Sequence, residues 1–124
     1  MIIGRLIETI NSLVPHTIEE SELMRFLNDI ETRIHDEVFL THKGLDAVNF
    51  SGYGEDTDMN TELLLKSPYD NVYRWYLEAQ IYMAIQETAR ANNAMAMFNA
   101  EYLSMMDYYN RNYMPKGIRS PRYW

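Results

Sequence analysis

The sequence predicts a small all-α protein: a small helical bundle of about four helices with a long loop and an extended C-terminal tail. The first of three supporting observations is that apolar residues recur every three or four positions over four segments, which is helical spacing. The chain has 124 residues, 47% of them apolar, enough for one domain with a modest core. Turn-forming residues gather in a loop over residues 43–66 and again after residue 112. We therefore expect a helical bundle domain over residues 1–112 and an extended basic tail over residues 113–124.

The first predicted helix covers about residues 2–14. Its apolar residues fall on one stripe, made of Ile3, Leu6, Ile7, Ile10, Leu13 and Val14. Pro15 ends this helix, because the residue before a proline is pushed out of the helical region.

The second predicted helix is longer and covers about residues 18–40. Thr17 and Glu20 have the spacing of a capping box, and Gly44 marks a stop shortly after the helix. The stripe expected to be buried consists of Leu23, Phe26, Leu27, Ile30, Ile34 and Val38. The acidic residues of this segment, Glu31 among them, are predicted to lie mostly off that stripe.

Residues 43–66 form a loop that is long for a compact domain, and such loops usually have a function. Three of its polar residues have the spacing that begins a calcium loop: Asp56, Asp58 and Asn60. However, Thr61 stands where the calcium loop needs glycine, and Ser67 stands where it needs a bidentate glutamate. We therefore favour a solvated acidic loop over a calcium site.

The third predicted helix covers about residues 68–91. Ser67 is suited to cap it, Pro68 to occupy its first position and Asp70 to complement its dipole. One face, expected to be core, carries Tyr69, Tyr73, Tyr76, Leu77, Ile81, Ala84 and Ile85. The opposite face carries Trp75, Ala79, Tyr82 and Ala89. Because a small domain has little capacity to bury both faces of a surface helix, the second face is predicted to need a partner.

The fourth predicted helix, about residues 94–112, follows a break at Asn92-Asn93 and should pair antiparallel with the third. Its main stripe consists of Ala94, Met97, Phe98, Tyr102, Met105, Tyr108 and Tyr109. A second stripe consists of Met95, Leu103 and Met106. The apolar residues left over on the two helices predict a subunit interface, formed by Trp75, Tyr82, Leu103 and Met106.

Charge is unevenly distributed in this chain, whose formal net charge is −7. Residues 1–70 hold 14 acidic and 5 basic side chains, whereas residues 108–124 hold 4 basic and no acidic ones. This distribution is not that of a duplex-DNA reader, which needs a broad positive face. The tail is predicted to dock on a neighbouring copy or a partner through Arg119, Arg122, Tyr123 and Trp124. Two alternatives for the tail are single-stranded nucleic acid stacking on its aromatic residues and a solvated chain end.

Several residues are of types found in catalytic or metal-binding sites, and we expect none of them to be catalytic or to bind a metal. His35-Asp36, with His16 and Asp107, has the residue types of the metal-dependent HD phosphohydrolases. A di-iron bundle needs repeated Glu-x-x-His motifs, but Glu31 and His35 are four apart. Without cysteine there is no thiolate ligand or disulfide, and no nucleophile motif is present. We therefore predict a protein that is not an enzyme, with no cofactor and no metal.

No apolar run approaches the roughly 20 residues that span a bilayer, and the N-terminus lacks a signal-peptide pattern. We therefore expect no membrane partner and synthesis in the cytoplasm.

At the level of motifs, the chain resembles the head–tail connector proteins of long-tailed phages, also called adaptor or head-completion proteins. The first matching motifs are Leu64-Leu65, Pro68-Tyr69-Asp70 and the Tyr-x-x-Tyr-Leu-x-Ala-x-Ile pattern from Tyr73 to Ile81. Later matches are Glu87, Asn92-Asn93, Phe98-Asn99, Tyr102 and the Arg-x-x-x-Pro stretch from Arg111 to Pro115. Upstream, residues 27–34 are similar to the family's second helix, and the chain departs from the pattern at Arg90-Ala91.

This resemblance implies a function in virion assembly. Family members are small helical bundles that form a ring below the portal, twelve-fold in the family, and join the DNA-filled capsid to the tail. It implies three partners: further copies of the chain, the portal protein, and a tail-side connector or stopper protein. DNA would pass through the ring without specific binding, and the location would be the head–tail interface of the virion. The residues themselves leave an alternative open, a small acidic helical regulator that binds one protein partner.

Overall fold

The structure is a computed structural model that describes residues 1–45 and 48–116. Its helices are α1 (Ile3–Leu13), α2 (Glu20–Ile34), the π-helical turn η1 (His35–Phe39), α3 (Asn71–Ala84) and α4 (Thr88–Asn112). Within the described ranges there is no β-strand, only two isolated bridges. The prediction of a small all-α fold is confirmed.

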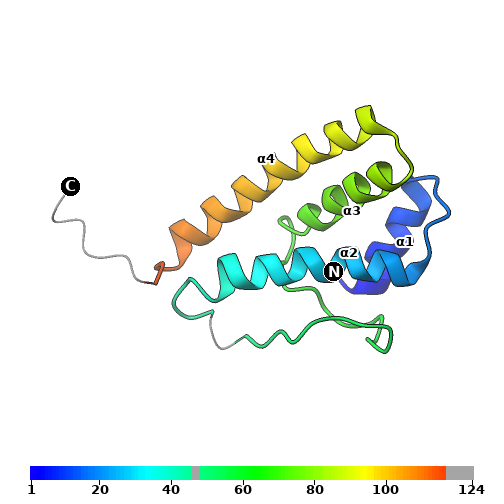
Figure 1. Cartoon of the computed structure of the whole chain (residues 1–124). Coiled ribbons are helices and arrows are strands. Elements are labelled where there is room, and N and C mark those ends of the chain that lie inside the picture. The colour runs from blue at the N-terminus through cyan, green and yellow to red at the C-terminus, as the bar shows by residue number, and fades with distance from the viewer. Residues whose placement is uncertain (46–47, 117–124) are drawn as a thin grey trace.

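Helix α3 lies at the centre of the bundle, in contact with α1, α2 and α4 (Figure 1). It pairs with α4 as an antiparallel hairpin, and α2 with η1 crosses beneath this hairpin. The largest fully buried side chains come from α1, α2, α3, α4 and the loop, and include Ile3, Leu27, Leu65, Tyr73 and Phe98. No helix among the described residues is long and apolar enough to cross a membrane.

The first helix matches its predicted range and buries Ile3, Leu6, Ile7 and Ile10, all from the predicted stripe. The long loop completes its N-terminus, because the carbonyls of Thr61 and Met59 accept the N–H groups of Ile3 and Gly4 at 3.0 and 2.8 Å. A Cβ atom at Gly4 would lie 3.2 Å from the Met59 carbonyl oxygen. Glycine therefore permits this close approach of loop and helix.

The predicted capping box of the second helix is wrong. Helix α2 begins at Glu20 with Glu19 as its N-cap, and no side chain caps it. The reason is local: His16 Nδ1 accepts the Ile18 N–H at 3.0 Å, so the turn before the helix is organised by His16. The C-terminal end of the second helix agrees better with its prediction, since η1 extends the helical path to Phe39. Gly44 then has a φ of +89°, a conformation that favours glycine.

The start of the third helix also differs from its prediction. Helix α3 begins at Asn71, with Asp70 rather than Ser67 as its N-cap and no side-chain cap. The Tyr69 N–H donates to the Lys66 carbonyl at 2.8 Å and closes a turn that contains Ser67 and Pro68. These two residues therefore precede the helix rather than open it.

The break between the third and fourth helices lies at residues 85–87, not at Asn92-Asn93. Gln86 has a positive φ of +64°, and the Glu87 N–H returns to the Tyr82 carbonyl at 2.8 Å. Asn92 and Asn93 are exposed residues inside α4, where asparagine is only mildly unfavourable. No glycine or asparagine marks residues 85–87, so the sequence carries no local signal for the true turn.

Candidate interaction surface

A shallow hollow of about 340 Å³ lies between α3 and α4. It is lined by Trp75, Glu78, Tyr82, Ala89, Arg90, Asn93 and Ala94. Trp75 and Tyr82 are half-buried and belong to the predicted interface. The structure therefore brings two of the four predicted residues to one concave site.

Two arginines lie near the rings in this hollow. The Arg74 guanidinium lies 4.4 Å from the centre of the Trp75 ring, and Arg74 Nε donates to Glu78 Oε2 at 2.7 Å. Glu78 is buried, so this ion pair also neutralises an acid inside the hairpin. Arg90 lies 5.8 Å from the Tyr82 ring centre. Rings held in this way lose little freedom when they meet a partner.

The second face of α3 is less exposed than the sequence predicts. Ala79, assigned to the outward face, is almost fully buried, as are Ala91 and Ala94 on α4. These small residues let the two helices approach closely along their contact. The chain therefore covers part of the second face of α3 by itself, because α3 is the central helix, while Trp75 and Tyr82 stay half-buried. The apolar surface left for a partner is correspondingly smaller.

The other two predicted interface residues lie elsewhere on α4. Leu103 follows Ala94 by nine residues, which at about 100° per residue places it on the opposite side of the helix. Its exposed fraction is 65%. Met106 is half-buried and packs against the core. Neither residue lines the hollow, so the structure does not unite the four residues in one patch.

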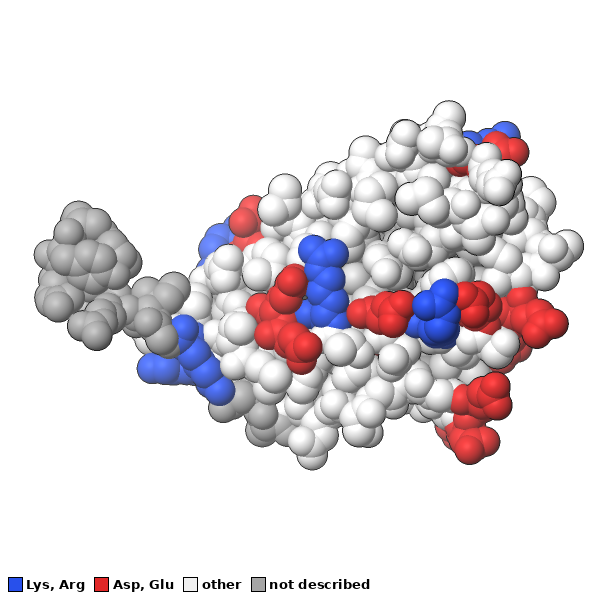
Figure 2. Space-filling view, viewed as in Figure 1, with Lys and Arg blue, Asp and Glu red and all other residues white. Residues whose placement is uncertain are grey.

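Exposed apolar side chains nevertheless extend along the α3–α4 hairpin beyond the hollow. Met83, Ile85, Met97 and Leu103 are the exposed large ones there, with fractions of 57%, 40%, 39% and 65%. Figure 2 shows the contrast in charge: blue and red groups alternate over α2, whereas the area over α3 and α4 is mostly uncharged. The charges on α2 and η1 include the ion pairs of Arg25 with Glu22 and of Arg33 with Glu37. The hairpin is thus the least charged broad surface in this view.

The four tail residues predicted to dock, Arg119, Arg122, Tyr123 and Trp124, lie outside the described residues. The start of the tail is described, and it lies beside the end of η1 (Figure 1). The Lys43 N–H donates to the Met114 carbonyl at 2.8 Å, and the Lys116 N–H donates to the Thr41 carbonyl at 2.6 Å. Two backbone hydrogen bonds therefore set the direction in which the tail leaves the bundle.

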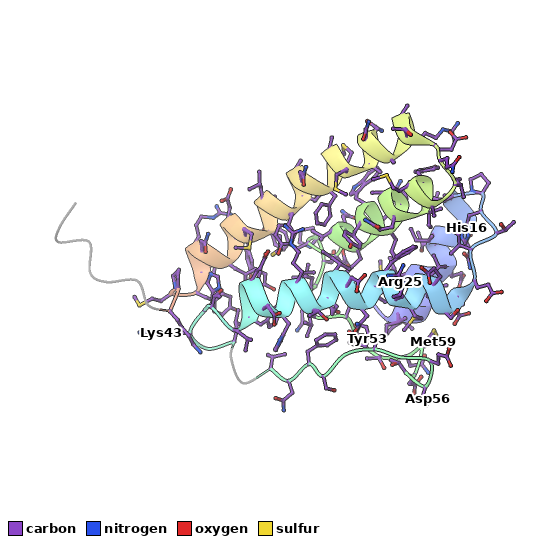
Figure 3. The ribbon with its side chains drawn as sticks, in the orientation of Figure 1. His16, Arg25, Lys43, Tyr53, Asp56 and Met59 are labelled. Carbon is purple, nitrogen blue, oxygen red and sulfur yellow. The ribbon has the colours of Figure 1, made fainter. Side chains whose placement is uncertain are left out.

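The candidate catalytic residues do not converge. His16 precedes α2 and His35 follows it, and the 15 residues between Glu20 and Ile34 rise about 1.5 Å each. Figure 3 shows His16 at the end of the molecule away from Lys43. His35 Nε2 is instead 3.1 Å from the Val48 carbonyl oxygen, and its ring is stacked on Phe39. Asp36 is exposed.

The acidic loop has no calcium-type geometry. Asp58 Oδ1 accepts the Asn60 N–H at 2.9 Å, a local turn that uses the carboxylate. Asp56 lies at the tip of the loop and is exposed (Figure 3). Across residues 1–45 and 48–116, no three His, Cys, Asp or Glu side chains are grouped closely enough to hold a metal ion.

The most unusual polar residue was assigned to the wrong environment by the sequence pattern: Glu31 is fully buried. Its Oε1 accepts the Tyr73 hydroxyl at 2.6 Å, and its Oε2 accepts the Tyr53 hydroxyl at 2.8 Å and the Leu64 N–H at 3.0 Å. The Tyr73 hydroxyl in turn accepts the Leu65 N–H at 2.8 Å. One carboxylate thereby joins α2 to α3 and to two points of the loop.

Burial raises the pKa of the Glu31 carboxyl, and the three hydrogen bonds only partly oppose this, because they favour the charged form. Burial and the nearby Glu31 charge also raise the pKa of the Tyr73 hydroxyl well above its ordinary value. A second contact attaches the loop to α2, since the Tyr53 N–H donates to Asn28 Oδ1 at 2.7 Å. Figure 3 shows Tyr53 on the loop segment that passes beneath α2.

One signal in the sequence indicates the burial of Glu31: its position among Leu27, Ile30 and Ile34 on a helix with a strongly apolar face. The donors that make its burial tolerable are distant in sequence, however. Comparison with known proteins adds nothing to this account of the residues: no family model, curated protein or solved structure matches the chain.

Proposed function

We propose that this chain is a structural virion protein, a head–tail connector that forms a ring below the portal and joins the DNA-filled capsid to the tail. Its partners are further copies of itself, the portal protein and a tail-side connector or stopper protein. The proposal combines the motif resemblance over residues 20–115 with the surface of the α3–α4 hairpin. The hairpin surface is the observation that carries it.

This surface has the composition of a protein–protein contact. It combines an aromatic pair, Trp75 and Tyr82, with exposed methionine, leucine and isoleucine side chains elsewhere on the hairpin. Aromatic residues, methionine and arginine are enriched at such contacts, and aspartate, glutamate and lysine are depleted. Trp75 and Tyr82 are the central contacts in this proposal, since tryptophan and tyrosine in desolvated pockets contribute most of the energy of an interface.

The distribution of the exposed groups implies weak association of the free protein. Leu103 lies on another side of α4 from the hollow, so no single broad apolar face is available to one partner. The −7 net charge adds repulsion between copies in solution. Ring formation would therefore depend on the portal as a template, with the basic tail residues Arg119, Arg122, Tyr123 and Trp124 docking on the acidic body of a neighbour or on the portal.

The test is to measure the mass of the full chain alone and after mixing with the purified portal protein. The proposal predicts a monomer or weak self-association alone, and many copies bound to each portal ring. Tyr82→Glu and Met97→Glu are expected to reduce the number of copies bound. Leu13→Glu is the control for Met97→Glu, because Leu13 is also an exposed apolar residue on a helix but lies on α1.

Two outcomes would contradict the proposal. A chain that ignores the portal and forms a tight one-to-one pair with another protein would be a small acidic regulator. Equal binding by Tyr82→Glu and Leu13→Glu would mean that the hairpin surface is not the contact. The phosphohydrolase alternative is tested separately, since loss of infectivity in Asp36→Asn particles, together with bound metal, would support it.

A further inference from the structure

A groove of about 570 Å³ opens at one end of the bundle, and its volume is within the range of about 300–1,000 Å³ that is usual for binding sites. It lies where the end of α4, the end of η1 and the segment before α3 meet. Its lining consists of Phe39, Leu45, Val48, Leu63, Leu64, Lys66, Ser67, Pro68, Tyr69, Tyr108, Tyr109 and Tyr113. Of these residues only Lys66 is charged.

The groove is built from aromatic rings that already pack on each other. Tyr69 and Tyr108 have ring centres 4.7 Å apart, and Tyr109 and Tyr113 have ring centres 5.7 Å apart. Phe39 and Tyr109 are buried and form its base, while Tyr69, Tyr108 and Tyr113 are half-buried. Half-buried rings around an apolar base are suited to receive further aromatic side chains edge-on or offset.

We propose that this groove holds the end of the chain's own tail, with Tyr123 and Trp124 as the groups that fill it. The tail begins at the groove, because Tyr113 is both the first residue after α4 and part of the lining. The hydrogen bonds of Met114 and Lys116 to residues 41–43 fix its origin beside η1. The sequence continues for eight residues after Lys116, which is about 26 Å of extended chain.

Because the tail starts at the lining itself, it does not have to cross the bundle to reach the groove. A short tether also keeps the two aromatic side chains at a local concentration near the millimolar range, so that modest affinity is enough for occupancy. The inference goes beyond the proposed function and does not rest on it, since the contact forms within a single free chain. In an assembled ring, the same tail would be released for another partner.

The chain has no cysteine, so an introduced pair would contain its only thiols. The test pair is Lys66→Cys with Ser120→Cys, because Lys66 is an exposed residue of the groove. The matched control is Asp107→Cys with Ser120→Cys. Asp107 is also exposed and lies at the same end of α4, but it does not line the groove. Disulfide formation in the full chain is followed by mass and by non-reducing electrophoresis.

The test pair is expected to form an intramolecular disulfide several times faster than the control pair, at a rate independent of protein concentration. Replacing both Tyr123 and Trp124 with serine should bring the test pair down to the control rate. Equal rates for the two pairs, or disulfide-linked dimers whose yield rises with concentration, would overturn the inference. So would an unchanged rate after the double serine replacement, because the aromatic residues would then not hold the tail.

Discussion

The hydrogen bonds that the Glu31 side chain accepts are expected to stabilise the fold, and Glu31→Leu tests this. The substitution leaves three donors without an acceptor: the hydroxyls of Tyr53 and Tyr73 and the N–H of Leu64. Each buried donor without an acceptor costs about 1–3 kcal/mol. Removing a buried charge offsets part of this cost, so we expect a net loss of about 3 kcal/mol in the free energy of unfolding.

The assay is urea unfolding followed by circular dichroism. With a slope of about 2 kcal/mol per molar urea, the midpoint should fall by about 1.5 M. Asp29→Leu is the matched control, because Asp29 lies on the same helix but is exposed, with only a 3.8 Å ion pair to Arg25. Its midpoint should change little. Equal midpoints for the two variants would refute the reasoning.

The pH dependence of the free energy of unfolding provides a second test of the Glu31 site. The folded pKa of Glu31 is raised, so the folded state binds its proton more tightly than the unfolded chain does. The contribution of the Glu31 proton to the free energy of unfolding is therefore greatest below the unfolded pKa of 4.5 and is lost as pH rises through the folded pKa. Glu31→Gln should remove this dependence, so that between pH 4.5 and neutrality its stability falls less with rising pH than that of the natural protein.

Three further predictions concern the loop and the hairpin. Tyr53→Phe should speed amide hydrogen exchange in residues 48–63 while leaving α3 and α4 protected, because it removes one of the loop's attachments to α2. Uniformly faster exchange across the chain would contradict this. Gln86→Gly should raise the free energy of unfolding, measured by thermal unfolding, by about 0.5–1 kcal/mol, because Gln86 has a positive φ. A lower melting temperature would argue against a left-handed residue at this turn. Arg74→Met should lower the free energy of unfolding by about 1–2 kcal/mol, because it leaves Glu78 buried without its cation. It should also lower the fluorescence anisotropy of Trp75 by freeing the ring, and unchanged anisotropy would show that Arg74 does not hold the Trp75 ring.

The helical class and the cores of α1 and α2 could be predicted, because both helices are amphipathic and one strong stripe determines which side is buried. The ends of the helices could not. His16 displaces the expected cap at Thr17, and Gln86 adopts a left-handed conformation without a glycine. Both depend on contacts that a local pattern does not contain.

The predicted interface was only partly resolvable from sequence. Trp75 and Tyr82 are seven residues apart on one helix, so helical spacing alone places them on the same side. Joining them to Leu103 and Met106 required the rotation of α4 about its axis, and the structure shows it by burying Ala91 and Ala94 on the side of α4 away from Leu103. Small residues carry little hydrophobic signal, so this rotation could not be predicted.

The most direct test of the proposed function is cryo-electron microscopy of the phage particles to which the proposal assigns this chain. The account predicts a ring of this four-helix fold between the portal and the tail, with Trp75 and Tyr82 of each copy covered by a neighbouring subunit or by the portal. Particles that lack this chain at the head–tail junction, or a ring in which the α3–α4 hairpin faces solvent, would contradict it.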